Sequence, residues 1–201
     1  MKIGFIGSGS VALACARQAL AAGHEVVLSN SRGPESLTSL VAELGPRATA
    51  GIREEAASAE IVVLAVPWPS VPEALKDLPP WNDRILVDAT NVFASLDPVV
   101  VADLGCRTGS EIVANLAPGA RVVKAFNSLY AEYIASPVRE GGRVVLFHAG
   151  DDAAAKGQVA KVAESFGFAP LDVGGLRTGG VLMQLGGPLS GQHLLRPDSF
   201  E

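Results

Sequence analysis

Short runs of consecutive apolar residues recur along the chain and alternate with stretches of helical pattern. Seven of these runs predict β-strands: Lys2–Ile6, Glu25–Ser29, Glu60–Val66, Arg84–Ala89, Arg121–Phe126, Arg143–His148 and Pro170–Val173. Several are apolar at successive positions rather than at every second one, which is typical of strands buried on both faces of a parallel sheet.

Helical patterns occupy four of the segments between these strands: Val11–Ala22, Glu35–Leu44, Ser70–Leu78 and Ala153–Phe166. Three of the four are followed by a glycine, a residue that commonly ends helices in a left-handed conformation. Alternation of strands and helices predicts right-handed crossovers. We therefore expect an α/β fold with a doubly wound, mostly parallel sheet of the Rossmann type over residues 1–173.

The remaining segment, residues 174–201, is rich in glycine. Its apolar residues Val181, Leu182, Leu185 and Leu189 lie at helical spacing, and its glycines would let another backbone approach closely. A partly apolar segment that cannot cover itself predicts a subunit interface or the wall of a second-substrate pocket. The alternative is a tail that packs on its own domain.

A glycine-rich turn directly follows the first predicted strand. Residues 7–12 have the sequence Gly-Ser-Gly-Ser-Val-Ala, the dinucleotide-binding pattern G-x-G-x-x-A between a strand and a helix. Gly7 allows the tight turn, and Gly9 leaves room for a pyrophosphate at the backbone. The helix that begins near Ser10 and Val11 offers free N–H groups to that anion. The alternative is a turn of the same shape that binds no ligand.

The end of the second strand distinguishes the two nicotinamide dinucleotides. NAD-binding proteins place an acidic residue there to bind the ribose 2′-hydroxyl. This chain has Asn30, Ser31 and Arg32 instead, and Ser8 in the first turn can add a hydroxyl. Hydroxyl groups and a guanidinium suit a 2′-phosphate, which favours NADP(H). The alternative is a polar loop with a solvated Arg32.

The later strand ends are expected to meet the same ligand, because ligands bind at the carboxyl ends of the strands in such sheets. The predicted strand Glu60–Val66 ends at Val66, and Pro67 and Trp68 follow it. Proline stiffens the loop, and the indole provides an aromatic wall at the cofactor. A tryptophan that simply packs in the loop is the alternative.

Polar residues also follow the predicted strands Arg84–Ala89 and Arg121–Phe126. Asn91 can bond a ribose or carboxamide, and Asn127 is placed for the carboxamide or the second substrate. Ala125, two residues before Asn127, is expected to contact the cofactor as well. Asp88 is expected to be a buried carboxylate that holds its loop, with catalysis as the alternative. Lys124 is expected to be structural, with a general acid as the alternative.

Composition and charge limit the partners, the location and the chemistry that the sequence allows. A formal net charge of −5 argues against nucleic acid as the main partner, and no apolar run is long enough to span a membrane. The chain also lacks a recognisable secretion signal, so we expect a cytoplasmic protein. Two isolated cysteines and three scattered histidines predict no disulfide scaffold, no metal site and no catalytic acid or base.

Six motifs together resemble the NADP oxidoreductases that depend on the deazaflavin coenzyme F420, whose relatives include the cytosolic domain of six-transmembrane metalloreductases. They are residues 3–10, 29–32, 63–68, 88–91, 122–129 and 170–176. The resemblance implies one Rossmann-type domain that binds NADP(H), often paired as a homodimer through the C-terminal region.

The resemblance also implies roles for particular residues. Ser8, Ser31 and Arg32 would bind the 2′-phosphate, the segment 66–68 would line the cofactor, and Asn127 would lie beside the nicotinamide. The deazaflavin enzymes carry histidine at the position of Asn127, whereas the metalloreductase domains carry asparagine.

Three functions are consistent with these observations. The first is an NADPH-dependent oxidoreductase that transfers hydride between NADP(H) and a flavin-like small molecule, either a deazaflavin or a flavin. The second is a module that senses NADP(H) without catalysis. The third is a small-molecule dehydrogenase, although such enzymes need a second domain for which few residues remain.

Overall fold

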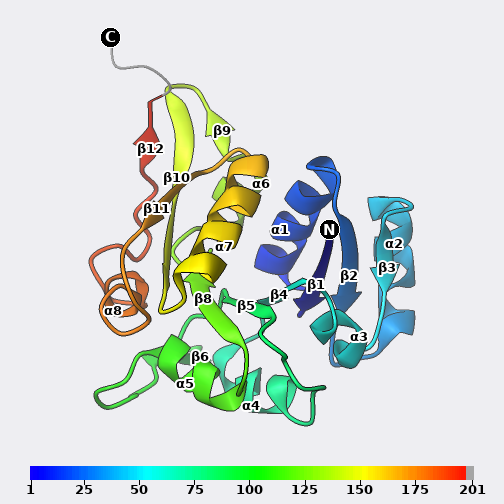
Figure 1. Ribbon diagram of the computed structural model, residues 1–201, viewed down its shortest axis with the longest axis horizontal. Coiled ribbons are helices and arrows are strands. Elements are labelled where there is room, and N and C mark those ends of the chain that lie inside the picture. Colours follow the sequence, from blue (N-terminus) through cyan, green and yellow to red (C-terminus); the bar gives the residue numbers. More distant parts are fainter. Residues whose placement is uncertain (198–201) are drawn as a thin grey trace.

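A computed structural model describes residues 1–197, and its centre is a twisted sheet with helices on both faces (Figure 1). Six strands run parallel in the order β3-β2-β1-β4-β5-β8. Their bounds are β1 Lys2–Ile6, β2 Glu25–Ser29, β3 Ala48–Ala50, β4 Ile61–Leu64, β5 Ile85–Asp88 and β8 Arg121–Ala125. This is the strand order of the Rossmann fold, so the predicted fold class is confirmed.

Two further strands, β10 (Gly142–Gly150) and β11 (Ala169–Asp172), extend the sheet beyond β8 in the opposite direction. In β10 only the last residues, His148 to Gly150, pair with β8. The first part of β10 therefore extends past the carboxyl end of β8. There it pairs with the short strands β9 (Val138–Arg139) and β12 (Leu195–Arg196).

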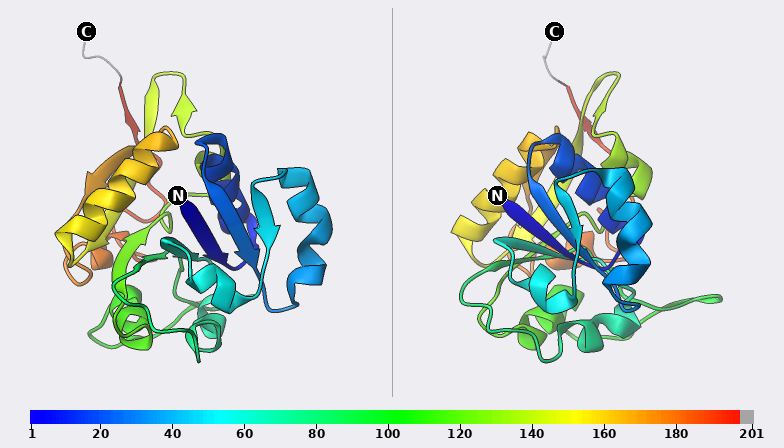
Figure 2. Two further views of the ribbon diagram at one scale, coloured as in Figure 1. Left: turned by 45° about the vertical axis from the view of Figure 1, so that its right-hand side comes forward. Right: turned by 90° about the vertical axis from the view of Figure 1, so that its right-hand side faces the viewer.

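The helices divide into two layers that bury separate apolar clusters. The cluster on one face is covered by α1 (Ser10–Ala21), α6 (Ala131–Ala135) and α7 (Ala153–Ser165), with α2 (Thr38–Leu44) at its edge. The opposite face is covered by α3 (Arg53–Ala57), α4 (Val71–Leu75) and α5 (Gly109–Leu116). Figure 2 shows both layers. Burial of both faces explains why the parallel strands are apolar at successive positions.

Helix α3 lies unusually close to the sheet. A Cβ atom at Gly4, in the middle of β1, would overlap the main chain of Ala56. Gly51, just before α3, is buried against Val27. Small residues at these points bring the beginning of α3, and with it Arg53, to the carboxyl edge of β1 and β2.

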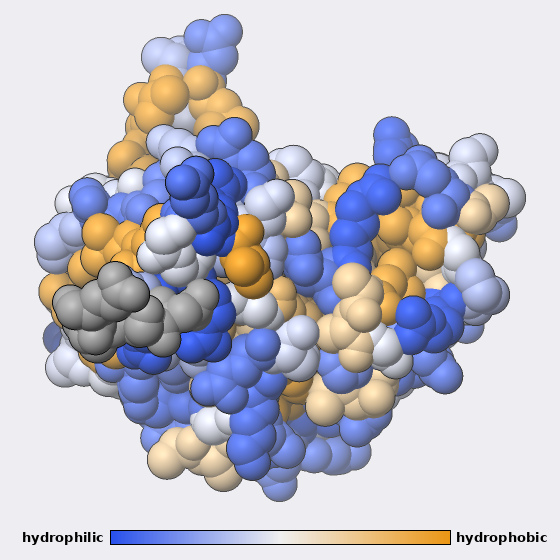
Figure 3. Space-filling model, turned by 90° about the horizontal axis from the view of Figure 1, so that it is seen from above, coloured by the Kyte–Doolittle hydropathy of each residue, from blue (hydrophilic) through white to orange (hydrophobic). Residues whose placement is uncertain are grey.

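A β-hairpin formed by β6 (Phe93–Leu96) and β7 (Val99–Val101) leaves the body of the molecule after β5 (Figure 2, right). Leu96, Val99, Val100 and Val101 are exposed on it. The projection at the top of Figure 3 is accordingly hydrophobic except at its tip. The sequence pattern does not predict this hairpin.

The C-terminal segment packs on its own domain as far as it is described, and residues 198–201 of the predicted segment lie outside the described part. Within residues 174–197 its only helix is the short α8 (Gly180–Met183), not the longer helix that its apolar spacing would allow. Met183 joins a third buried cluster with Val145, Phe147 and Ala149 of β10. Within residues 1–197, every helix is too short or too polar to cross a membrane.

Candidate functional site

A cleft of about 940 Å³ opens where β1 and β4 lie side by side. This is the point at which the strand order reverses, and ligands bind there in doubly wound sheets. Three parts of the chain line the cleft: residues 6–9, residues 29–32 with Arg53, and residues 65–67, 69, 70, 73 and 74. Its volume is in the range of sites for cofactors and other small molecules.

The glycine turn lines this cleft through Gly7, Ser8 and Gly9. Gly7 has φ +115°, and a Cβ atom there would overlap the main chain of Ala65, directly after β4, so the turn requires glycine. Gly9 differs, because its φ of −78° and ψ of −176° suit any residue, and nothing lies within 4 Å of the place where its Cβ would be. No packing or backbone requirement therefore explains Gly9, whereas a ligand that approaches the main chain does.

The first turn of α1 provides unpaired donors next to Gly9. No side chain caps this helix, and its first intrahelical bond within the described chain runs from Leu13 N–H to Gly9 O. The N–H groups at Ser10 and Val11 are therefore free to bind an anion. Neither side chain is among the residues that line the cleft, so any contact from these two falls to the main chain.

The turn after β2 is held in place by side chains of its own. Asn30 Oδ1 accepts a hydrogen bond from Arg32 N–H at 2.9 Å, and Asn30 Nδ2 donates to Ser8 Oγ at 3.3 Å and Ser36 Oγ at 3.0 Å. Ser29 is fully buried and donates to Phe5 O. Asn30 thus joins the second-strand turn to the glycine turn.

Two residues of this turn remain available to a ligand. Ser31 and Arg32 are exposed, and both line the cleft. Within residues 1–197, the guanidinium of Arg32 has no hydrogen bond or ion pair. The turn therefore presents an unpaired cation and a hydroxyl to the cleft, and no carboxylate at the end of β2 opposes a phosphate.

Arg53 lines the same cleft but escaped the sequence analysis. Its guanidinium donates to the main-chain oxygen of Glu73 and lies 3.3 Å from Glu54 Oε1. Helix α3 has only five residues, which is too short for a helical pattern to stand out in the sequence. The signal that was available is the neighbouring glycine at position 51, since a glycine between apolar residues often marks a close approach of backbones.

The segment after β4 lines the cleft only in part as expected. Val66 and Pro67 face it, but Trp68 is not among its lining residues. The indole is half-buried against the second apolar cluster and lies close to Gly109 at the start of α5. In this structure Trp68 therefore packs in its loop, and its contact with the cofactor stays a prediction.

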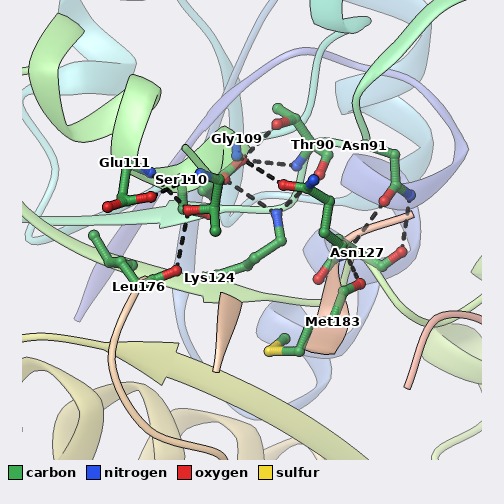
Figure 4. A network of polar contacts seen from close by, with 12 residues as sticks. Thr90, Asn91, Gly109, Ser110, Glu111, Lys124, Asn127, Leu176 and Met183 are labelled. Carbon is green, nitrogen blue, oxygen red and sulfur yellow. Dashed lines mark hydrogen bonds and ion pairs between the residues drawn. The ribbon is translucent and has the colours of Figure 1, made fainter. Parts of the chain in front are cut away.

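The carboxyl ends of β5 and β8 carry a buried ion pair (Figure 4). Lys124 Nζ lies 3.3 Å from Asp88 Oδ2, and both side chains are almost completely enclosed. Asp88 also accepts hydrogen bonds from the Thr90 main chain and hydroxyl, at 2.9 and 2.6 Å, and from Ser110 Oγ at 2.5 Å. Lys124 donates in addition to Thr90 O at 3.2 Å.

These contacts determine the charge state of Asp88. Burial alone would raise its pKa, but the Lys124 charge and the hydrogen bonds from Ser110 and Thr90 outweigh burial and hold the pKa below its usual value. Asp88 is therefore ionised at neutral pH, and all its partners belong to the fold. This arrangement agrees with the structural roles that the sequence predicted for Asp88 and Lys124.

The ion pair fixes the loop that carries Asn91, and Asn91 faces Asn127 (Figure 4). Asn91 Nδ2 donates to Asn127 O at 2.8 Å, and Asn127 Nδ2 donates back to Asn91 Oδ1 at 3.2 Å. Asn127 Nδ2 also donates to Met183 O in the C-terminal segment at 2.8 Å. Phe126, directly before Asn127, has φ +66°, a strained conformation that is often found at functional sites.

Three of the predicted residues lie at this second centre rather than in the cleft. Asn91 is half-buried and Asn127 is buried, and neither lines the cleft. Ala125 is completely buried in the core, so its side chain cannot reach a ligand and only its main chain is available. The two centres lie at the carboxyl ends of neighbouring strands, because β4 pairs with β5 and β5 with β8.

A Rossmann sheet with a glycine turn at its switch point defines the class of dinucleotide-binding proteins. Residues 2–92 match the family described as NADP oxidoreductase, coenzyme F420-dependent. Over 177 residues the chain is 34% identical to metalloreductase STEAP3 of Rattus norvegicus, a match that covers 87% of this chain and 34% of that protein. The chain thus spans about a third of the length of this curated relative.

Two solved structures are similar over nearly the whole chain. The hypothetical protein SMa0349 of Sinorhizobium meliloti is 39% identical with a TM-score of 0.91, and the match covers 98% of this chain and 96% of that one. A proposed F420-dependent NADP reductase of Arthrobacter sp. FB24 is 28% identical with a TM-score of 0.76, over 92% and 90% of the two chains. The family model thus matches residues 2–92 of this chain, and both solved structures are similar to nearly all of it.

Proposed function

We propose that this protein binds NADP(H) across its switch-point cleft and transfers hydride between it and a flavin-like acceptor, a deazaflavin or a flavin. The observation that carries the proposal is Gly9, whose missing side chain leaves open space at the start of α1. The family supports the cofactor, and the unpaired Arg32 supports the phosphorylated form. A cytoplasmic location stays a prediction.

We infer which residues would hold each part of the cofactor. Main-chain groups of the glycine turn, residues 7–11, would hold the pyrophosphate, and Asn30, Ser31 and Arg32 with Ser8 would hold the 2′-phosphate. The segment 66–68 would line the nicotinamide ribose. Asn91, Asn127 and the Ala125 main chain would meet the nicotinamide. When bound, NADPH supplies the hydride, and the residues of this chain bind and orient it.

The titratable groups suggest that positioning is the main contribution of the protein to the reaction. Asp88 and Lys124, the charged residues at the strand ends next to Asn91 and Asn127, are engaged with each other. Hydride transfer between two ring systems needs close alignment and no protein acid or base. Because this ion pair leaves neither charged group free to act as an acid or base, it also favours a second candidate function, a module that senses NADP(H) without catalysis.

Loss of Arg32 is expected to change nucleotide preference. Arg32→Ala should weaken NADPH binding about 10- to 100-fold, because a charge-assisted hydrogen bond contributes about 1.5–3 kcal/mol. NADH binding should change little, since NADH lacks the 2′-phosphate. Calorimetric titration of both nucleotides measures the two affinities.

The control for this experiment is Arg17→Ala, which removes an exposed arginine of α1 that pairs with Glu43. It should leave both affinities unchanged. Equal losses for NADPH and NADH in Arg32→Ala would contradict the 2′-phosphate role. Stopped-flow oxidation of NADPH with a deazaflavin and with FMN tests catalysis, and tight NADPH binding without turnover would favour the sensing module.

We further propose that two copies pair through the C-terminal segment. Val181 and Leu182 of α8 are exposed, as are Leu194 and Leu195. Light scattering is expected to show a dimer of the wild-type chain and a monomer of Val181→Asp/Leu182→Asp. A monomeric wild-type chain at micromolar concentration would exclude this pairing.

A further inference from the structure

The side-chain oxygen of Asn127 is the feature that the proposed function leaves unexplained. Asn127 is 6% exposed, and its Oδ1 has no hydrogen-bond partner within the described chain. A buried acceptor without a donor costs about 1–3 kcal/mol, so such a group normally finds a donor in the protein, in ordered water or in a ligand.

The orientation of this amide is fixed by its neighbours. Nδ2 donates to two oxygen atoms, Asn91 Oδ1 and Met183 O. Both of these atoms are acceptors only, so neither could bond to an oxygen atom at the position of Nδ2. Rotating the amide by half a turn would therefore set oxygen against oxygen at Met183. Oδ1 is consequently the atom left for a ligand, and the site is an acceptor that takes an N–H or O–H donor.

The position of Asn127 selects the class of donor. Asn127 follows β8, next to the strand end that carries Asn91, on the carboxyl edge where the far end of a dinucleotide in the switch-point cleft would lie. The nicotinamide carboxamide has an N–H donor at that end of the cofactor. Resting on the proposed function, we propose that Asn127 Oδ1 accepts a hydrogen bond from the carboxamide N–H, with Asn91 and Met183 as its positioning groups.

The C-terminal segment therefore contributes to cofactor recognition through a main-chain atom. It is attached beside the site at two further points: Thr108 Oγ1 donates to Leu176 O, and Gln184 Oε1 accepts from Gly109 N–H (Figure 4). Oδ1 is enclosed in this structure, so a ligand reaches it through a local shift of the neighbouring chain. Gly186 and Gly191 have positive φ and free space around them, which suits such a shift.

Three ligands test this inference on the full chain. They are NADP⁺, its 3-acetylpyridine analogue, which has a methyl group in place of the carboxamide NH₂, and 2′-phospho-ADP-ribose, which lacks nicotinamide. The wild-type protein should bind NADP⁺ about tenfold more tightly than the acetylpyridine analogue in calorimetry. This comparison needs no variant, so a folding defect cannot obscure it.

Variants then assign the preference to one atom. Asn127→Leu should bind NADP⁺ and the analogue equally, and Asn91→Ala should reduce the preference, while both keep wild-type affinity for 2′-phospho-ADP-ribose. The matched control is Ser128→Ala, which removes the neighbouring buried hydroxyl that also lacks a partner. It should keep the tenfold preference.

Two results would overturn the inference: equal binding of the two nucleotides by the wild-type protein, or a preference that survives in Asn127→Leu. Loss of the preference in Ser128→Ala would move the acceptor to Ser128 and likewise overturn it. In each of these cases tight binding of 2′-phospho-ADP-ribose would leave the proposed function standing. Failure of the wild-type protein to bind any of the three ligands would overturn the proposed function itself.

Discussion

Gly9→Val is expected to lower NADPH affinity by about 100-fold while the protein stays folded. The valine side chain would occupy the space at the start of α1 that we assign to the pyrophosphate, and forcing atoms into filled space costs about 1–3 kcal/mol. The fold should tolerate the change, because the backbone at Gly9 is extended and its Cβ position is free. Titration calorimetry measures the affinity, and thermal unfolding without nucleotide checks the fold.

A matched control exists in the same chain. Gly157 is exposed in the middle of α7, and a Cβ there would also meet nothing within 4 Å. Gly157→Val therefore makes the same chemical change at an open glycine outside the cleft, and it should leave NADPH affinity unchanged. Normal affinity in Gly9→Val would show that the glycine turn does not hold the phosphates.

Lys124→Met is expected to destabilise the protein by about 3–5 kcal/mol, because it leaves the Asp88 carboxylate buried without its countercharge. The double variant Asp88→Asn/Lys124→Met should recover most of that loss, since it removes both charges at once. The free energy of unfolding in urea is measured for the wild-type protein, the single variants Lys124→Met and Asp88→Asn, and the double variant. A double variant whose loss equals the sum of the two single losses would show that the pair is not coupled.

The same pair predicts the behaviour of the protein in acid. The pKa of Asp88 in the folded protein is lowered, so the carboxylate contributes stability above its unfolded pKa of about 3.9 and loses it as pH falls through the folded value. The contribution of Asp88 to the unfolding free energy should therefore stay constant between about pH 7 and pH 5 and decline in stronger acid. Asp88→Asn/Lys124→Met should lack this part of the decline.

The sheet and the glycine turn were predictable because their signals are local and strong. Strands buried on both faces must be apolar at successive positions, and the turn combines a required glycine at position 7 with one at position 9 that no packing demands. The placement of Arg32 also followed from the sequence, since the end of β2 necessarily faces the switch point.

The rest depends on contacts between distant parts of the chain. The Trp68 indole packs next to Gly109, and the amide of Asn127 is oriented by Met183, which is 56 residues away. Short elements such as α3 and the β6–β7 hairpin contain too few residues to show a recognisable periodicity of hydrophobic positions. Asp88 and Lys124 were each recognisable as strand-end residues, but their pairing required the register of β5 against β8, in which they lie side by side.

The reversal of β10 has a consequence for engineering this protein. Because the first part of β10 lies beyond β8, its main-chain groups find partners in β9 and in the late strand β12, and Val145 N–H bonds to Leu194 O. A chain truncated before Leu194 would leave those amides and carbonyls unpaired at an exposed sheet edge. Such an edge can pair with a strand of another molecule and so promote aggregation. Affinity tags and fusions are therefore better placed at the N-terminus, away from the pairing of β12 with β10.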